Sequence, residues 1–253
     1  MTDNLPAGFA RHNIGHLSAS SINLWTNAPD VWVVKYLLGK NTGASAAMER
    51  GKAVEQAVVW MLDGRDDAID KATESYNAAL TFEAAEDADT QRDLIAPMAQ
   101  EAHAALSEYG PPSFETDDGQ RKVSIAARLP DGVIPVIGYL DLVYPKHGLV
   151  VDLKTTTRVP SVMSADHQLQ RAIYARAMSN HAVRFLYVSG KKHAWLEDGD
   201  PTAILANAKT QIARLNRFLI AHDAESARAC VPVNPNSFYW RGAEPLRREI
   251  YGL

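Results

Sequence analysis

The chain has 253 residues, of which 46% are hydrophobic and 22% charged, and it contains a single cysteine, Cys230. One cysteine excludes an internal disulfide framework, a four-cysteine zinc site and a four-cysteine iron–sulfur cluster. Because the sequence has no run of about 18 apolar residues and its first 16 residues have no apolar secretion core, we expect no membrane association and a cytoplasmic location.

Charge is divided unevenly along the chain, although the formal net charge is only −4. Residues 1–118 hold 8 Lys and Arg against 19 Asp and Glu, whereas residues 119–253 hold 18 against 11. A basic half indicates a polyanion such as nucleic acid as the partner of that half. A chance division of solvated surface charge is the alternative that this count leaves open.

The first half of the chain is predicted to be helical after a flexible start. Apolar residues at helical spacing indicate the helices, and a serine is a possible cap of the first one. Pro and Asp residues separate one helix from the next. We expect helices at residues 18–25, 31–38, 48–62, 68–81 and 89–109. Pro97 is expected to kink the last of them, because proline removes a hydrogen bond from a helix interior.

The second half changes to a strand-like period. Strands are expected at residues 121–129, 136–144 and 149–155 as a three-stranded meander, then a helix at 164–180, strands at 183–189 and 193–196, and a helix at 201–222. The tail from residue 231 is predicted to be a packed irregular arm. This order predicts an α/β (α+β) fold with a central mixed sheet flanked by helices. We expect a single domain, 1–253, with a mainly helical part at 17–118, a sheet core at 119–200, and a C-terminal helix and arm at 201–253.

Two carboxylates are predicted to lie opposite each other in this meander. If the turn spans residues 145–148, the hairpin register pairs Asp141 with Asp152. Side chains alternate along a strand, so Asp152 and Lys154 share one face and Leu153 takes the other. Like charges placed opposite each other among apolar neighbours are unfavourable, and a divalent cation with oxygen ligands would offset that cost. An exposed hairpin whose charges form a surface ion cluster is the alternative.

The segments that carry these residues, Gly-Tyr-Leu-Asp at 138–141 and Val-Val-Asp-Leu-Lys-Thr at 150–155, resemble the core motif of the PD-(D/E)XK nucleases. They are most similar to the RecB-like branch, which includes phage recombination exonucleases. The resemblance implies a restriction-endonuclease-like core and a hydrolytic site with one or two Mg²⁺ or Mn²⁺ ions. Asp141, Asp152 and Lys154 match its catalytic residues, and the backbone carbonyl of Leu153 would be a further metal ligand.

Three further motifs extend the resemblance. Gln170 and Tyr174, four residues apart on one helix face, match a pair that follows the lysine strand in this branch; a solvated glutamine beside a core tyrosine is the alternative. The Arg-Gly-Lys-Ala-Val-Glu run at 50–55 implies Glu55 as a metal ligand, against the alternative of a helix-edge glutamate. Residues 17–21 with the Ala-Pro pair at 28–29 resemble the serine-containing opening of RecB-like domains. Alanine stands there where cysteine is frequent, and the C-terminal cysteines of iron–sulfur relatives are absent, so no cluster is implied.

The resemblance implies a metal-dependent exonuclease of linear DNA, single- or double-stranded, acting in the 5′-to-3′ direction in phage-type recombination or repair. Such an enzyme would work in the host cytoplasm if phage-encoded, with a single-strand annealing protein as a further partner. Residues predicted to contact DNA are Ser20, Arg121, Lys122, Arg128, Arg158, Arg171, Arg176 and Trp240. A solvated surface charge is the alternative for each Lys and Arg, and packing is the alternative role for Trp240. A structure-specific or single-strand endonuclease of the same fold, a non-catalytic DNA-binding module, and an unrelated metal-dependent phosphohydrolase remain alternatives.

Overall fold

The structure, a computed structural model, describes residues 4–40, 43, 45–81, 87–113 and 121–253. Its helices are α1 (Ala7–Arg11), α2 (Ala19–Asn27), α3 (Pro29–Tyr36), α4 (Ala46–Leu62), α5 (Ala68–Ala79), α6 (Ala88–Arg92), α7 (Ile95–Leu106), α8 (Ala165–Ala177), α9 (Pro201–Ala221), α10 (Ala224–Cys230) and α11 (Glu244–Tyr251). Its strands are β1 (Leu17–Ser18), β2 (Arg121–Leu129), β3 (Gly132–Leu140), β4 (Leu142–Tyr144), β5 (Leu149–Thr155), β6 (Ala182–Val188) and β7 (His193–Leu196). None of the helices described is both long and apolar enough to cross a membrane.

The strands form two mixed sheets, ordered β1-β3-β2 and β4-β5-β6-β7. In the first, β2 and β3 are an antiparallel hairpin and β1 runs parallel to β3. In the second, β5 and β6 are parallel and connected through α8, while β4 and β7 flank them in antiparallel orientation. This arrangement of mixed sheets flanked by helices confirms the predicted α/β fold class.

The predicted three-stranded meander is wrong in one respect. The expected strand at residues 136–144 is divided: β3 ends at Leu140, the chain bends at Asp141, and β4 begins at Leu142 in the other sheet. The predicted register is confirmed, because Leu142 pairs with Val151 and the β4–β5 ladder starts one residue after Asp141. Asp141 therefore lies at the junction of the two sheets.

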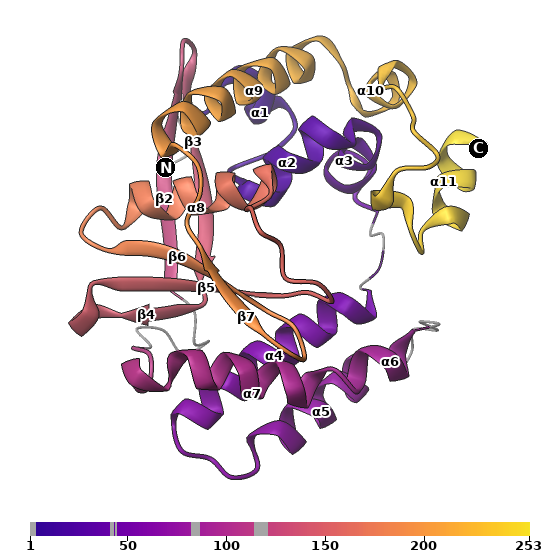
Figure 1. The fold of residues 1–253 in the computed structure, drawn as a ribbon. Coiled ribbons are helices and arrows are strands. Elements are labelled where there is room, and N and C mark those ends of the chain that lie inside the picture. The colour runs from indigo at the N-terminus through magenta and orange to yellow at the C-terminus, as the bar shows by residue number, and fades with distance from the viewer. Residues whose placement is uncertain (1–3, 41–42, 44, 82–86, 114–120) are drawn as a thin grey trace.

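Helices cover both faces of the β4–β7 sheet (Figure 1). Helices α4–α7 lie on one face, where Val151 and Leu153 of β5 join their apolar core. Helices α8 and α9, together with α1–α3, pack with the first sheet on the other side, where Val150 of β5 and Phe185 of β6 are buried. Because side chains alternate along β5, Asp152 points to the face of the sheet that α8 covers, the same face as Val150.

Several helical predictions need correction. The expected helix at 89–109 is divided into α6, α7 and a final 3₁₀ turn, with Pro97 in the first turn of α7, where its missing N–H costs no hydrogen bond. Within the start expected to be flexible, residues 7–11 form α1, and its Phe9 is completely buried. The tail from residue 231, predicted to be irregular, contains α11, and α10 directly precedes it. The predicted boundary after residue 118 lies outside the described residues.

Candidate active site

The bend at Asp141 exposes one edge of β5, and the Asp141 side chain occupies it. Oδ2 of Asp141 accepts a hydrogen bond of 3.0 Å from the backbone N–H of Leu153. Since β3 turns away at this point, the carboxylate satisfies a strand donor that a continuing β-ladder would have paired. The interaction fixes Asp141 beside the segment that carries Asp152 and Lys154.

Asp152 is fully buried, with 0% of its surface exposed. Its Oδ2 accepts a hydrogen bond of 2.8 Å from Nε2 of Gln170, and its Oδ1 lies 2.5 Å from Nζ of Lys154. Both oxygens of the buried carboxylate are therefore engaged, Oδ1 by the ammonium of Lys154 and Oδ2 by the amide of Gln170. Each carboxylate oxygen has a second lone pair that a cation could use.

Gln170 and Tyr174 form a relay between the two strands that carry the carboxylates. Nε2 of Gln170 donates to Asp152 and also, over 2.8 Å, to the hydroxyl of Tyr174. That hydroxyl donates to the backbone carbonyl of Tyr139, at 2.5 Å and two residues before Asp141. The i,i+4 spacing on α8 places both side chains on one face. One helix thus connects β5 to the end of β3.

Gly138 makes room for this relay. A Cβ atom at Gly138 would lie 2.5 Å from Cε1 of Tyr174, closer than van der Waals contact permits. The ring therefore packs directly on the β3 backbone, and the glycine of the Gly-Tyr-Leu-Asp segment is explained by the tyrosine of α8.

Lys154 follows Asp152 on the same face of β5 and is only partly exposed, with 22% of its side chain accessible. Its Nζ also lies 5.2 Å from the ring centroid of Phe185, the β6 partner of Asp152. Burial alone would lower the pKa of this ammonium, but the carboxylates of Asp152 and Asp141 outweigh burial and raise it. Lys154 is therefore a charged donor held at the site.

Burial raises the pKa of both carboxylates, and Lys154 opposes that shift. Burial, followed by the nearby charges of Asp152 and Glu55, raises the pKa of Asp141 well above its usual value. Burial also raises the pKa of Asp152, although Lys154 opposes the shift. The raised pKa values mean that the one nearby ammonium does not fully stabilise two negative charges at this site. A bound cation would supply the missing positive charge.

Helix α4 approaches the site from the other side of the sheet. Glu55 contributes to the electrostatic field at both Asp141 and Lys154. Five residues earlier, Arg50 is 4% exposed, and its guanidinium donates to the side chain of Gln91 and, over 3.1 Å, to Oγ1 of Thr155 at the end of β5. Arg50 thereby attaches α4 to the strand of Asp152 and Lys154.

The donor atoms of the site suit a hard divalent cation. Asp141, Asp152 and Glu55 offer carboxylate oxygens, the ligand type that Mg²⁺ and Mn²⁺ prefer, and burial raises the pKa of both aspartates, so they lack compensating positive charge. Within the described residues, no group of three or more His, Cys, Asp and Glu side chains is gathered closely enough to hold a metal ion. The oxygen donors fit such an ion in type and charge, but the side chains of Asp141, Asp152 and Glu55 are not gathered into a closed ligand set in this structure.

A cavity of about 880 Å³ opens beside these residues. Asp141, Gln170 and Tyr174 line it together with Ser20 and the half-exposed ring of Tyr139. A substrate in this cavity would meet one carboxylate of the pair directly.

Comparison with known proteins then decides the family. The family model described as the PD-(D/E)XK nuclease superfamily matches residues 16–236. The chain belongs to this superfamily. The crystal structure of SSO0001 is similar over 76% of this chain and 85% of that one, at 12% sequence identity and a TM-score of 0.34. No curated protein matches the chain significantly.

Members of the PD-(D/E)XK superfamily are nucleases that generally use Mg²⁺ or Mn²⁺, and a nuclease of this kind binds DNA. In this member, the bend at Asp141 and the β4–β5 register bring Asp141, Asp152, Lys154, Gln170 and Tyr174 to one place, although Asp141 and Asp152 are not a ladder pair. Glu55 acts on the same site through its charge.

Some of the residues predicted to contact DNA lie near the candidate site, and others do not. Ser20 lines the cavity beside the candidate nuclease site, and Arg121 and Lys122 begin β2, where Arg121 pairs with Leu140 just before the bend. Arg158 is exposed beyond β5. Arg171 instead donates from Nε to the carbonyl of Val183, which attaches α8 to β6.

The proposed contact of Trp240 with DNA is wrong. Its side chain is 1% exposed, and Nε1 donates over 2.8 Å to the buried carboxylate of Asp30. A ring enclosed in this way cannot stack on a base, so Trp240 has the packing role that was the alternative.

His167 is a residue of the candidate active site that the sequence did not predict. It lines the cavity on α8, three residues before Gln170, and its Nδ1 lies 2.6 Å from the hydroxyl of Tyr187. Burial and the charge of Lys154 lower its pKa to about 4, so the ring is neutral at neutral pH. The i,i+3 spacing from Gln170 is the signal that could have found it.

Proposed function

We propose that the protein is a metal-dependent exonuclease of linear DNA from the RecB-like, phage recombination branch of the PD-(D/E)XK superfamily. The observation that carries the proposal is the buried Asp152, which contacts Lys154 on one oxygen and Gln170 on the other beside the Asp141 bend. Gln170 and Tyr174 at this position are the pair by which the sequence resembles that branch. We further propose that residues 1–253 form a single nuclease domain.

Asp141, Asp152, Glu55 and the backbone carbonyl of Leu153 would hold one or two Mg²⁺ or Mn²⁺ ions. When bound, such an ion polarises the scissile phosphate and lowers the pKa of the attacking water. Lys154, charged at neutral pH, would orient the water and stabilise negative charge that develops on the phosphate. Gln170 and Tyr174 would position Asp152 relative to Asp141 rather than contact the DNA.

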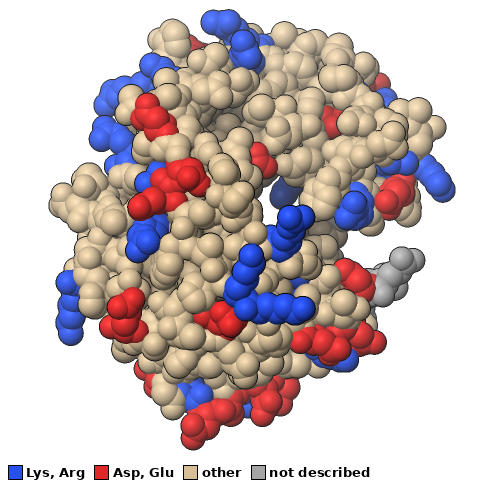
Figure 2. Space-filling model, in the orientation of Figure 1, with Lys and Arg blue, Asp and Glu red and all other residues tan. Residues whose placement is uncertain are grey.

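The charge distribution supports DNA as the substrate. Figure 2 shows Lys and Arg side chains beside a hollow in the middle of the molecule, whereas Asp and Glu side chains gather over the lower part, where α5–α7 lie. A polyanion is repelled by the acidic layer and attracted to the basic hollow, which would restrict how a DNA end approaches.

The decisive experiment compares Mg²⁺-dependent degradation of a linear duplex, a linear single strand and a covalently closed circle. The wild type should degrade linear DNA and leave the circle intact, and Asp152→Ala and Lys154→Ala should each lose at least about 100-fold in rate. Asp70→Asn, at an exposed acid of α5, is the matched control and should keep full activity. Cleavage of the circle would replace the exonuclease with an endonuclease, and full activity of either site variant would overturn the site.

Metal binding is tested separately by calorimetric titration of Mn²⁺ into the protein without DNA. The wild type should bind Mn²⁺, and Asp141→Asn should weaken binding by at least about tenfold. A protein that binds DNA but does not bind Mn²⁺ and does not hydrolyse DNA would be a non-catalytic module.

Labelling of the 5′ or 3′ end then determines the direction of digestion, for which we propose 5′ to 3′. Co-purification tests the proposed single-strand annealing partner.

A further inference from the structure

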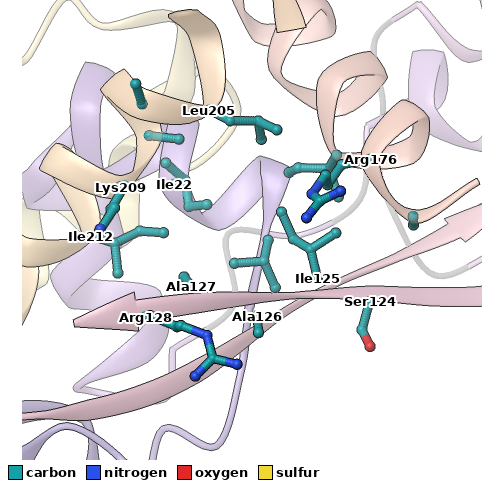
Figure 3. A pocket seen from close by; sticks show the side chains of 15 residues that line it. Ile22, Ser124, Ile125, Ala126, Ala127, Arg128, Arg176, Leu205, Lys209 and Ile212 are labelled. Carbon is teal, nitrogen blue, oxygen red and sulfur yellow. The ribbon is translucent and has the colours of Figure 1, made fainter. Parts of the chain in front are cut away.

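A second cavity, of about 700 Å³, lies away from the two carboxylates, between the outer edge of β2 and helices α8 and α9 (Figure 3). We call it the β2 groove, and the residues that line it include Ile125, Arg128, Arg176, Leu205, Lys209 and Ile212. Neither Asp141 nor Asp152 lines the groove. It shares only Ile173 of α8 with the cavity of the candidate active site.

The groove runs along a free strand edge. β2 is the last strand of its sheet and pairs only with β3 among the described residues. Residues 124–128 all line the groove, although alternate side chains of a strand point to opposite faces. Consecutive lining residues therefore mean that the backbone edge itself faces the groove. Five residues present an edge roughly 13 Å long, enough for four or five residues of an added strand.

The interior of the groove is apolar. Figure 3 shows Ile125 and Ala127 on the side of β2 that faces the helices, opposite Leu205 and Ile212. The side chains of Ser124 and Arg128 leave the strand on its other side. An added strand would thus place alternate residues against an apolar surface and the intervening ones toward solvent.

The charges of the groove have one sign. Arg128, Arg176 and Lys209 are exposed and line it, while no Asp or Glu among the described residues does. None of the three has an ion-pair or hydrogen-bond partner among the residues that the structure describes. Unpaired cations around an apolar surface complement a ligand that carries both acidic and apolar groups.

We propose that the β2 groove binds an extended acidic segment of another protein, which adds a strand to the edge of β2. Main-chain hydrogen bonds to β2 would supply affinity, and apolar residues of the segment would pack on Ile125 and Leu205. Acidic residues on its other face would pair with Arg128, and acidic residues at its two ends would pair with Arg176 and Lys209 on the helix side. DNA is the less suitable occupant, because its phosphates gain nothing from the apolar surface or the free strand edge. This site goes beyond the proposed nuclease function and does not depend on it.

The test uses a fluorescein-labelled peptide of seven residues in which Asp alternates with Val or Ile, with fluorescence anisotropy as the readout and no divalent metal present. The wild type should bind it, and Arg176→Glu/Lys209→Glu should weaken binding by about tenfold or more. A peptide with Asn in place of each Asp should show a similar loss. Lys146→Glu/Lys191→Glu, which reverses two exposed charges outside the groove, is the matched control and should bind as the wild type does.

The same titrations with a labelled 12-base-pair duplex separate the two classes of ligand. The proposal is overturned if the peptide does not bind up to millimolar concentration, or if the groove variant binds it as tightly as the wild type. It is also overturned if the groove variant loses affinity for the duplex but not for the peptide, because the groove would then be a DNA path. A catalytically inactive protein that still binds the peptide would refute the proposed function and leave this inference standing.

Discussion

Replacement of Gly138 with alanine tests whether Tyr174 is positioned by direct packing on β3. The added methyl group would lie 2.5 Å from Cε1 of Tyr174. Gly138 does not have a positive φ, so alanine is compatible with its backbone and would by itself stabilise the protein by about 0.4–1 kcal/mol. The steric overlap costs about 1–3 kcal/mol, which leaves a net loss of up to about 2.6 kcal/mol in the free energy of unfolding.

A double-mutant cycle isolates the contact. In a Tyr174→Ala background the ring is absent, so Gly138→Ala should be neutral or slightly stabilising, and the coupling energy should be about 1–3 kcal/mol. Urea unfolding followed by tryptophan fluorescence gives both stabilities. Gly15→Ala is the control, because no atom lies within 4 Å of its added Cβ.

Nuclease activity provides the second readout of the same variant. Displacement of the ring breaks the contacts of the Tyr174 hydroxyl with Tyr139 and Gln170, so Gly138→Ala should reduce kcat by about 10–100-fold with little change in KM for DNA. Equal costs of Gly138→Ala in both backgrounds, or a folded variant with wild-type kcat, would refute the positioning role of the ring.

Three further variants test the surroundings of the site. The pKa of His167 is about 4 in the folded protein against about 6.5 in the unfolded chain, so the unfolded state binds more protons between these values and stability is lost as the pH falls from about 6.5 to about 4. His167→Asn should lose less stability over this range in urea titrations, and equal losses would contradict the prediction. Asp30→Ala leaves the ring N–H of Trp240 without its acceptor and should lower the free energy of unfolding by about 1–3 kcal/mol; an unchanged melting temperature would show that the bond is dispensable. Arg50→Met removes the contact with Thr155 and should cost about 1–3 kcal/mol and reduce nuclease activity, whereas wild-type activity would show that α4 does not support β5.

The pairing of β4 with β5 could be predicted because local chemistry determines it. Proline and glycine bound the connecting turn, and Gly148 adopts a left-handed φ of 56° that fixes where β5 begins. Once the turn is fixed, the period of two assigns every side chain to a face. This explains why Asp152 and Lys154 lie together while Leu153 enters the other core.

The division of β3 from β4 could not be predicted in the same way. The residues around Asp141 are apolar and suited to a strand, and the bend there goes with a hydrogen bond between its carboxylate and the N–H of Leu153, 12 residues away. Only the tertiary arrangement supplies that partner. The C-terminal α10, by contrast, had a local signal, since Asp223 and Ser226 form a capping box.

The division also explains what the relay on α8 contributes. Because β3 and β5 belong to different sheets, no continuous ladder fixes Asp141 relative to Asp152. Two connections do so instead: the Leu153 N–H bound to Asp141, and the chain of hydrogen bonds from Asp152 through Gln170 and Tyr174 to β3. A cation shared by the carboxylates would require that separation to be held closely, so the helical pair has a positioning role that follows from the break between the sheets.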